Sequence, residues 1–241
     1  MYSKRRKLAA EFLGTFGLVL FSTGAICSDQ FLRSANQPRL GVLGIALAYG
    51  LAAGGLFTAL GHVSGGHFNP AVTIGSWATR KLGTFDTLTY VAAQLSGAAA
   101  ASYALRYVVP DETWGAVMLG TPALANGLTR GPAMLIEGFL TLFLFVVVFS
   151  AAPGLPPIVK LSGDQRLGSF AGPAVGFVVA AGAIFGGPFT GGIMNPARAF
   201  GPALAAHHWT NQGVYWVGPL AGAMVGAVLC DFLFRPLSRP S

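Results

Sequence analysis

Charged residues are scarce in this sequence: Asp, Glu, Lys and Arg make up only 10% of its 241 residues, while 53% are hydrophobic. A soluble domain carries about 25% charged residues. There are two cysteines, Cys27 and Cys230, and they lie within or at the end of apolar runs, without the spacing of a disulfide framework or a metal site. The formal net charge of +7 comes from short basic clusters between apolar runs, which argues against a nucleic-acid partner. These shortages indicate that lipid is the solvent of this chain.

Six apolar runs are long enough to cross a bilayer, for which a helix needs about 20 residues. The runs are 8–27, 40–60, 88–109, 132–152, 167–187 and 214–234. A basic cluster, Lys4 to Lys7, precedes the first run and could begin a signal peptide. The run is of spanning length, contains Glu11 and leads into further runs, so an uncleaved first helix is expected.

Two further apolar runs, 69–79 and 195–206, are about half of the spanning length. They begin with the same tripeptide, Asn69-Pro70-Ala71 in one and Asn195-Pro196-Ala197 in the other. Asparagine is a strong N-cap and proline suits the first position of a helix. The expected fold is therefore an all-α membrane protein with six transmembrane helices and two re-entrant half-helices.

The basic residues indicate the orientation of the spans. If the N-terminus is cytoplasmic, ten Lys and Arg residues fall in cytoplasmic segments and four, Arg33, Arg39, Arg106 and Arg130, in outer ones. The positive-inside rule favours this arrangement. We expect a multi-pass protein of the cell membrane (inner or plasma membrane) with both termini in the cytoplasm.

The chain contains an internal repeat with an offset of 126 residues. Glu11 and Glu137 are separated by this offset, as are Asn69 and Asn195, and it lays SGGHFNPA over TGGIMNPA. We expect one channel domain, 1–241, built from repeats 1–115 and 127–241. Each repeat holds three spans, so the second enters the membrane from the opposite side. Inverted repeats place a functional site near the midplane, where broken helices meet.

The expected geometry brings two helix N-termini to one point. Such ends carry partial positive charge and unpaired N–H groups, which repel cations. The amides of Asn69 and Asn195 add donors there. The segments before them cannot face lipid with extended backbone, so their carbonyls are expected to line a water-filled pore. These segments are Gly65-Gly66-His67-Phe68 in the first repeat and Gly191-Gly192-Ile193-Met194 in the second.

The sequence resembles the aquaporin family, also called major intrinsic proteins, along nearly its whole length. The resemblance rests on AEFLGTF, GHVSGGHFNPAVT, IEGFLTLFLFVVVF, GGPFTGGIMNPARAFGPAL and YWVGPLAGA. It implies a passive channel for water that excludes protons and ions, a homotetramer of independent pores, and no cofactor, no metal and no enzymatic activity.

The resemblance also assigns roles to single residues. Glu11 and Glu137 are similar to buried acids that hold the re-entrant loops; tolerated membrane acids and a proton relay are the alternatives. Arg198 resembles the filter arginine near the outer mouth, against a snorkelling surface arginine. His62 matches a pore-facing histidine on the cytoplasmic side, against a histidine that is merely packed.

The filter is where the sequence departs from the family pattern. Its positions fall at Tyr49, Ala183, Gly192 and Arg198, where water channels typically have Phe, His, Cys and Arg. Ala183 stands where water channels typically have histidine, and the loss of that imidazole ring predicts a wider filter, unless Tyr49 fills the space. A wider filter would be open to ammonia, urea, hydrogen peroxide or undissociated metalloid acids. Glycerol facilitators usually carry Asp where this chain has Ala199, so the sequence does not resemble that branch of the family either.

Three other functions compete with a passive pore. An ion-coupled secondary transporter also uses inverted repeats, but it needs coupling-ion ligands near the midplane. A membrane enzyme needs a catalytic constellation or a metal cluster, and none stands out in the sequence. A non-conducting structural protein leaves the paired Asn-Pro-Ala segments unexplained.

Overall fold

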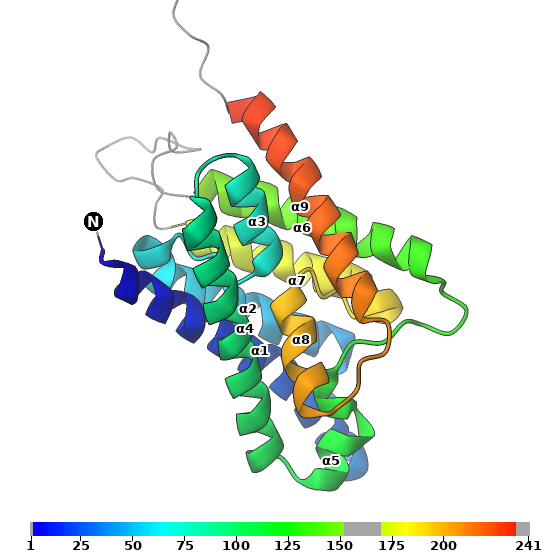
Figure 1. The fold of residues 1–241 in the computed structure, drawn as a ribbon. Helices are drawn as coiled ribbons and strands as arrows, with labels where there is room; N and C mark the ends of the chain where they lie inside the picture. The colour runs from blue at the N-terminus through cyan, green and yellow to red at the C-terminus, as the bar shows by residue number, and fades with distance from the viewer. Residues whose placement is uncertain (1, 152–169, 235–241) are drawn as a thin grey trace, which may run out of the picture.

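The structure, a computed structural model, describes residues 2–151 and 170–234. These residues form a bundle of helices in which short elements lie among long ones (Figure 1). The elements are α1 (Lys4–Ser34), α2 (Gly41–Ser64), α3 (Pro70–Ala78), α4 (Thr84–Val108), α5 (Asp111–Ala116), the 3-10 helix η1 (Met118–Gly120), α6 (Arg130–Ala151), α7 (Ala171–Thr190), α8 (Pro196–Ala205) and α9 (Gln212–Phe234).

Five helices are long and apolar enough to cross a membrane: α1, α2, α6, α7 and α9. The expected run 88–109 lies on α4, which has 25 residues but carries Asp86, Gln94 and Arg106. Gln94 is fully buried and faces the interior of the bundle, whereas Asp86 and Arg106 lie near the two ends of α4. Residue 152 of the fourth expected span, residues 167–169 of the fifth, and Lys160, Arg166, Arg235 and Arg239 lie outside the described residues.

Both ends of α1 are fixed to neighbouring elements, which extends this helix beyond the expected span. At its start, Lys4 pairs with Asp86 of α4 at 2.7 Å. At its end, the carboxylate of Asp29 accepts hydrogen bonds from the side chain of Arg39 and the backbone N–H of Gly41. Asp29 thereby holds the start of α2 against the end of α1.

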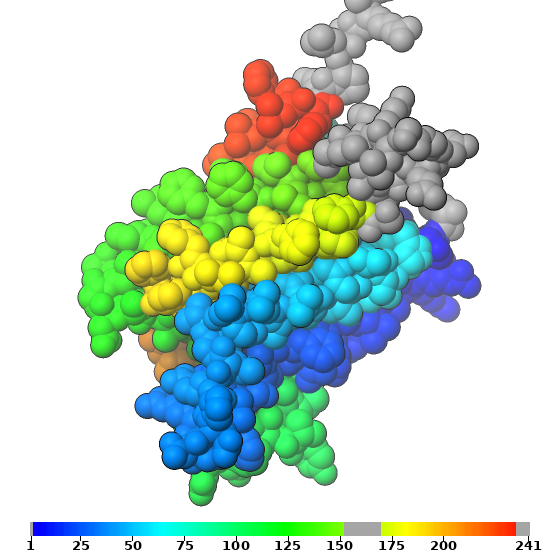
Figure 2. Space-filling model, turned by 180° about the vertical axis from the view of Figure 1, so that it is seen from behind, coloured from blue at the N-terminus to red at the C-terminus, as the bar shows by residue number. Residues whose placement is uncertain are grey.

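The helices of the two repeats pack closely through glycines. Helices α2 and α7 lie side by side (Figure 2). A Cβ atom at Gly54 would come within 2.8 Å of the Gly172 carbonyl oxygen, and one at Gly176 within 2.7 Å of the Gly50 carbonyl oxygen. Small residues at four-residue spacing allow this approach between membrane helices.

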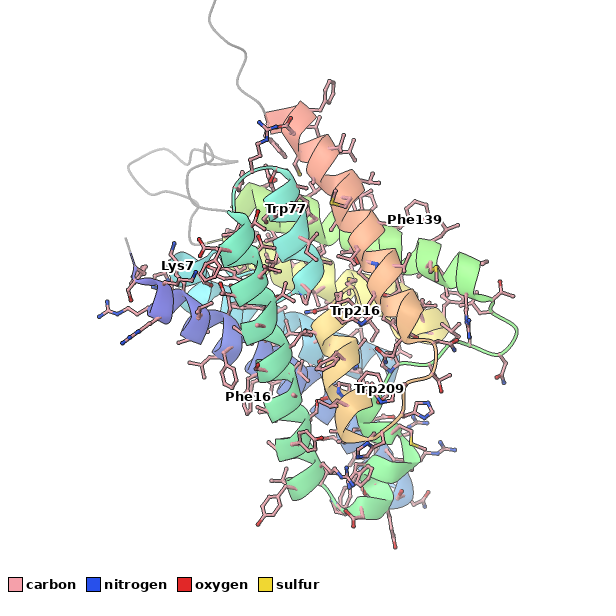
Figure 3. All side chains as sticks on the ribbon, viewed as in Figure 1. Lys7, Phe16, Trp77, Phe139, Trp209 and Trp216 are labelled. Atoms are coloured by element: carbon pink, nitrogen blue, oxygen red, sulfur yellow. The ribbon has the colours of Figure 1, made fainter. Side chains whose placement is uncertain are left out.

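Large apolar side chains point away from the bundle. Phe139 on α6 is 58% exposed and projects outward, as Figure 3 shows. Leu51 and Phe232 are also exposed on the outer faces of α2 and α9. An apolar surface of this extent is unusual for a protein in water and fits contact with lipid.

The two half-helices, α3 and α8, occupy the middle of the bundle. Helices α3 and α8 lie end to end, with their first turns toward each other (Figure 1). Each packs against a long helix of the other repeat: α3 against α9, and α8 against α4. This packing of each half-helix against the other repeat fixes the relative position of the two segments that begin with Asn-Pro-Ala.

Candidate pore and filter

Glu11 anchors the loop that precedes α3. Its Oε1 accepts from the Ser64 hydroxyl at 2.6 Å and the His67 N–H at 3.0 Å. Its Oε2 accepts from the Phe68 N–H at 2.8 Å and the Gln94 amide at 2.7 Å. The carboxylate is fully buried. Four donors satisfy both oxygens of the ionised form, which offsets the cost of burying it.

Glu137 makes the corresponding contacts in the second repeat. Its Oε1 accepts from the Thr190 hydroxyl at 2.6 Å and the Ile193 N–H at 3.0 Å, and its Oε2 accepts from the Met194 N–H at 2.6 Å. Each of these donors lies 126 residues after its counterpart. Leu220 stands where the first repeat has Gln94, so Glu137 lacks the fourth bond. The repeat read from the sequence thus recurs in the hydrogen bonds.

The half-helices begin at the Asn-Pro-Ala segments. Asn69 caps α3 by accepting the Ala71 N–H at 2.8 Å, and Asn195 caps α8 by accepting the Ala197 N–H at 3.0 Å. Both asparagines have extended backbone, and proline occupies the first helical position. Capping uses only the side-chain oxygen, so the amide nitrogens remain available as donors.

Those nitrogens cross between the repeats. Asn69 Nδ2 donates to the Met194 carbonyl at 2.8 Å, and Asn195 Nδ2 donates to the Phe68 carbonyl at 2.9 Å. Phe68 and Met194 both have left-handed backbone, with φ of 46° and 57°. One hydrogen of each amide is therefore committed to the opposite loop, and one is left for another acceptor.

A small cavity lies at this junction. Its volume is about 20 Å³, which is enough for a single water molecule. Polar groups reach it from Asn69, Asn195, Tyr49 and His67, and the rest of its wall is apolar. The apolar wall comes from both repeats and includes Leu18, Val72, Leu144, Val148, Val175 and Val179.

Two of the expected filter residues bind backbone carbonyls. The Tyr49 hydroxyl donates to the Ile193 carbonyl at 2.7 Å, and Arg198 Nη1 donates to the Gly120 carbonyl at 2.7 Å. Arg198 is only 2% exposed, and its Nε has no partner among the described residues.

The other two filter positions lie directly against each other. Gly192 has a left-handed φ of 59°, and a Cβ atom there would come within 2.9 Å of Ala183 Cα and of the Gly182 carbonyl oxygen. The loop therefore rests on the backbone of α7. Close packing against α7 therefore accounts for the glycine at position 192. Ala183 places only a methyl group at its own position in the filter.

The histidines separate into two environments. His67 lines the cavity, with its Nδ1 at 3.1 Å from the Thr73 hydroxyl and its ring edge against Tyr90. His62 is exposed at the end of α2, and its ring contacts Tyr2 with centroids 5.8 Å apart. His62 does not line the cavity around the asparagines.

Comparisons with known proteins agree with this architecture. The family model described as Major intrinsic protein matches residues 1–230. The chain belongs to this family. It is 42% identical over 231 residues to the lens fiber major intrinsic protein of Ovis aries, covering 96% of this chain and 82% of that protein. The protein of the same name from Gallus gallus is 42% identical over 234 residues, covering 97% of this chain and 83% of that protein.

A solved structure shares the fold. The aquaglyceroporin from Plasmodium falciparum superposes with a TM-score of 0.80 and 22% identity, covering 97% of this chain and 98% of that one. The family and the all-helical membrane fold predicted from the sequence are confirmed. As a major intrinsic protein, the chain is a membrane channel and not an enzyme. No group of residues able to hold a metal occurs in the part of the chain that the structure describes.

Several residues of the channel site were not identified from the sequence. The hydroxyls of Tyr90 and Tyr215 donate to the carbonyls of Ser64 and Thr190, each at 2.9 Å, and fix the starts of the two loops. Gly120 accepts from Arg198 through a left-handed turn at its own position. Only Gln94 carried a usable signal, because an uncharged amide inside an apolar span needs a buried partner.

Proposed function

We propose that this channel is a passive pore for water that excludes protons and ions. The observation that carries the proposal is the pair of capped helix starts at a cavity of about 20 Å³. Water is small enough for this space and can both accept and donate hydrogen bonds. The pore is proposed to lie in the cell membrane with both termini in the cytoplasm, in a homotetramer of independent pores.

The helix starts favour neutral molecules over cations. Helices α3 and α8 direct the positive ends of their dipoles toward the cavity. A cation there meets partial positive charge from two sides and an apolar wall that offers it no oxygen ligands. A neutral molecule pays no comparable cost.

The asparagine amides orient a passing water. Each has one hydrogen left after its bond to the opposite loop. A water oxygen that accepts from both amides has its own hydrogens directed away from the midplane, along the pore. This orientation interrupts proton hopping along a file of waters, while whole molecules continue to pass.

Arg198 adds a second barrier to cations on the outer side. Its guanidinium is held by the Gly120 carbonyl and carries a fixed positive charge. The small Ala183 leaves room in the same filter. Neutral solutes such as ammonia, urea, hydrogen peroxide and undissociated metalloid acids are therefore proposed to reach the asparagine pair from outside.

Stopped-flow light scattering on proteoliposomes tests the proposal. We expect fast osmotic shrinkage that ionophores do not change. Water flow no faster than in protein-free vesicles, or flow that depends on an ion gradient, would contradict a passive water pore.

A further inference from the structure

The four filter positions have counterparts 126 residues away in the other repeat. Tyr49, Ala183, Gly192 and Arg198 correspond to Val175, Phe57, Gly66 and Val72. All four counterparts line the cavity that also contacts Asn69 and Asn195. In an inverted repeat, equivalent positions lie on opposite sides of the midplane. The pore therefore has a ring of four equivalent positions on each side of the asparagine pair.

The two rings differ in chemistry. The outer ring has a cation with an unpaired donor at Arg198, where the inner ring has Val72. The outer ring has a methyl group at Ala183, where the inner ring has the phenyl ring of Phe57. The outer ring thus holds the charge of Arg198 and the hydroxyl of Tyr49, whereas the side chains of the inner ring are apolar.

The ring of Phe57 is held in place by glycines. A Cβ atom at Gly66 would come within 2.8 Å of its Cδ2, and one at Gly61 within 3.2 Å of its Cδ1. The absence of side chains at both positions makes room for the phenyl group between α2 and the loop. Phe57 is 6% exposed, so packing fixes its conformation.

The same place in the second repeat is built differently. There the loop glycine, Gly192, lies against the backbone at Ala183, because no aromatic ring stands between loop and helix. At this position of the ring, the two repeats differ by one bulky side chain. That side chain is the phenyl ring of Phe57.

We propose that Phe57 determines which neutral solutes cross the channel. The inference rests on the proposed function and deepens it. Phe57, Val72 and Val175 offer no hydrogen-bond partner, so a molecule that passes them gives up hydrogen bonds on their side of the pore. Water loses few hydrogen bonds and is narrow, whereas urea and glycerol lose more hydrogen bonds and are wider. The wild type therefore conducts water and excludes urea and glycerol at the inner ring, although Ala183 leaves the outer ring small.

Uptake measurements on proteoliposomes test this assignment. Water permeability and urea and glycerol uptake are measured for the wild type, Phe57→Ala and Phe57→Val, with Phe139→Ala as a matched control on the lipid-facing side of α6. We expect solute uptake at background for the wild type and Phe139→Ala. Phe57→Ala should raise urea uptake about tenfold, the change produced by removing about 1.4 kcal/mol from a barrier, and Phe57→Val should raise it by less.

The outcomes separate the two proposals. Fast water flow with wild-type urea uptake well above background overturns the assignment to Phe57 and leaves the water pore standing. Unchanged urea uptake in Phe57→Ala and Phe57→Val, with water flow retained in either variant, does the same. Wild-type water flow at background would remove the proposed function itself, and the assignment with it.

Discussion

The amide nitrogen of Asn69 lies 2.8 Å from the carbonyl oxygen of Met194, in the loop that leads into the other half-helix. The reciprocal bond joins Asn195 to Phe68. Each helix start is therefore positioned by the opposite repeat as well as by its own. The site at the midplane depends on both repeats being folded, because neither asparagine keeps its orientation without the other loop.

Asn69→Asp should weaken this junction while it preserves the cap. The carboxylate still accepts the Ala71 N–H, but it cannot donate to Met194 and instead faces a carbonyl oxygen. We expect a loss of about 1–3 kcal/mol of stability. We also expect a measurable cation leak, because the new negative charge cancels part of the positive charge at the two helix starts. Thermal unfolding and cation flux into vesicles measure the two effects. Asn36→Asp, at an exposed left-handed position, should change neither.

The two buried acids should differ in how much the fold depends on them. Glu11→Gln turns an amide group toward four donors, whereas Glu137→Gln does so toward three. Each unmet charged hydrogen bond costs about 1.5–3 kcal/mol. Unfolding temperatures in detergent should fall for both variants and further for Glu11→Gln. The exposed Glu112→Gln serves as the control. Equal stability of Glu11→Gln and the wild type would contradict the anchoring role.

Gly192→Ala should destabilise the filter loop rather than simply narrow the pore. Alanine at a left-handed φ costs about 1–2 kcal/mol, and its Cβ atom would collide with the α7 backbone at Ala183. Gly115→Ala is the matched control, because nothing lies within 4 Å of its Cβ position and it is helical. That variant should be neutral or gain up to about 1 kcal/mol. Thermal unfolding of the pair distinguishes packing from pore lining, and an unchanged unfolding temperature for Gly192→Ala would show that the loop does not rest on α7.

Arg198→Val places at position 198 of the outer ring the residue that the inner ring has at the equivalent position, Val72. The variant removes a fixed positive charge and the bond to Gly120. We expect water flow to persist and proton leak, followed with a pH-sensitive dye inside vesicles, to rise about tenfold for each 1.4 kcal/mol of barrier removed. Arg33→Val, on the exposed end of α1, should leave proton leak unchanged. No rise in Arg198→Val would place cation exclusion entirely at the helix starts.

The sequence was sufficient for the features that depend on local chemistry. Asparagine followed by proline predicted the starts of α3 and α8, the lengths of the apolar runs predicted the long helices, and the single acids in two of those runs marked Glu11 and Glu137. The shared offset predicted which contacts would recur. These features follow from neighbours in the chain or from a pattern that repeats along it.

Long-range contacts could not be predicted in the same way. The bond from Arg198 to Gly120 joins positions that no periodicity relates, and the bond from Tyr49 to Ile193 depends on how closely α2 approaches the second loop. The packing of Gly192 against α7 could not be predicted, because the sequence gives a residue's size but not the direction in which its Cβ atom would point. Phe57 was overlooked because a phenylalanine in an apolar span looks like core or lipid-facing packing until the cavity is seen.

The most direct test of the account records water flow and proton flow in the same proteoliposomes. An osmotic step is applied to vesicles that contain the wild-type protein and a pH-sensitive dye, first without and then with a proton gradient. The account predicts osmotic shrinkage well above that of protein-free vesicles, with proton entry no faster than theirs. Proton entry that rises together with water flow would contradict a pore in which Asn69, Asn195 and two helix starts pass water and stop protons.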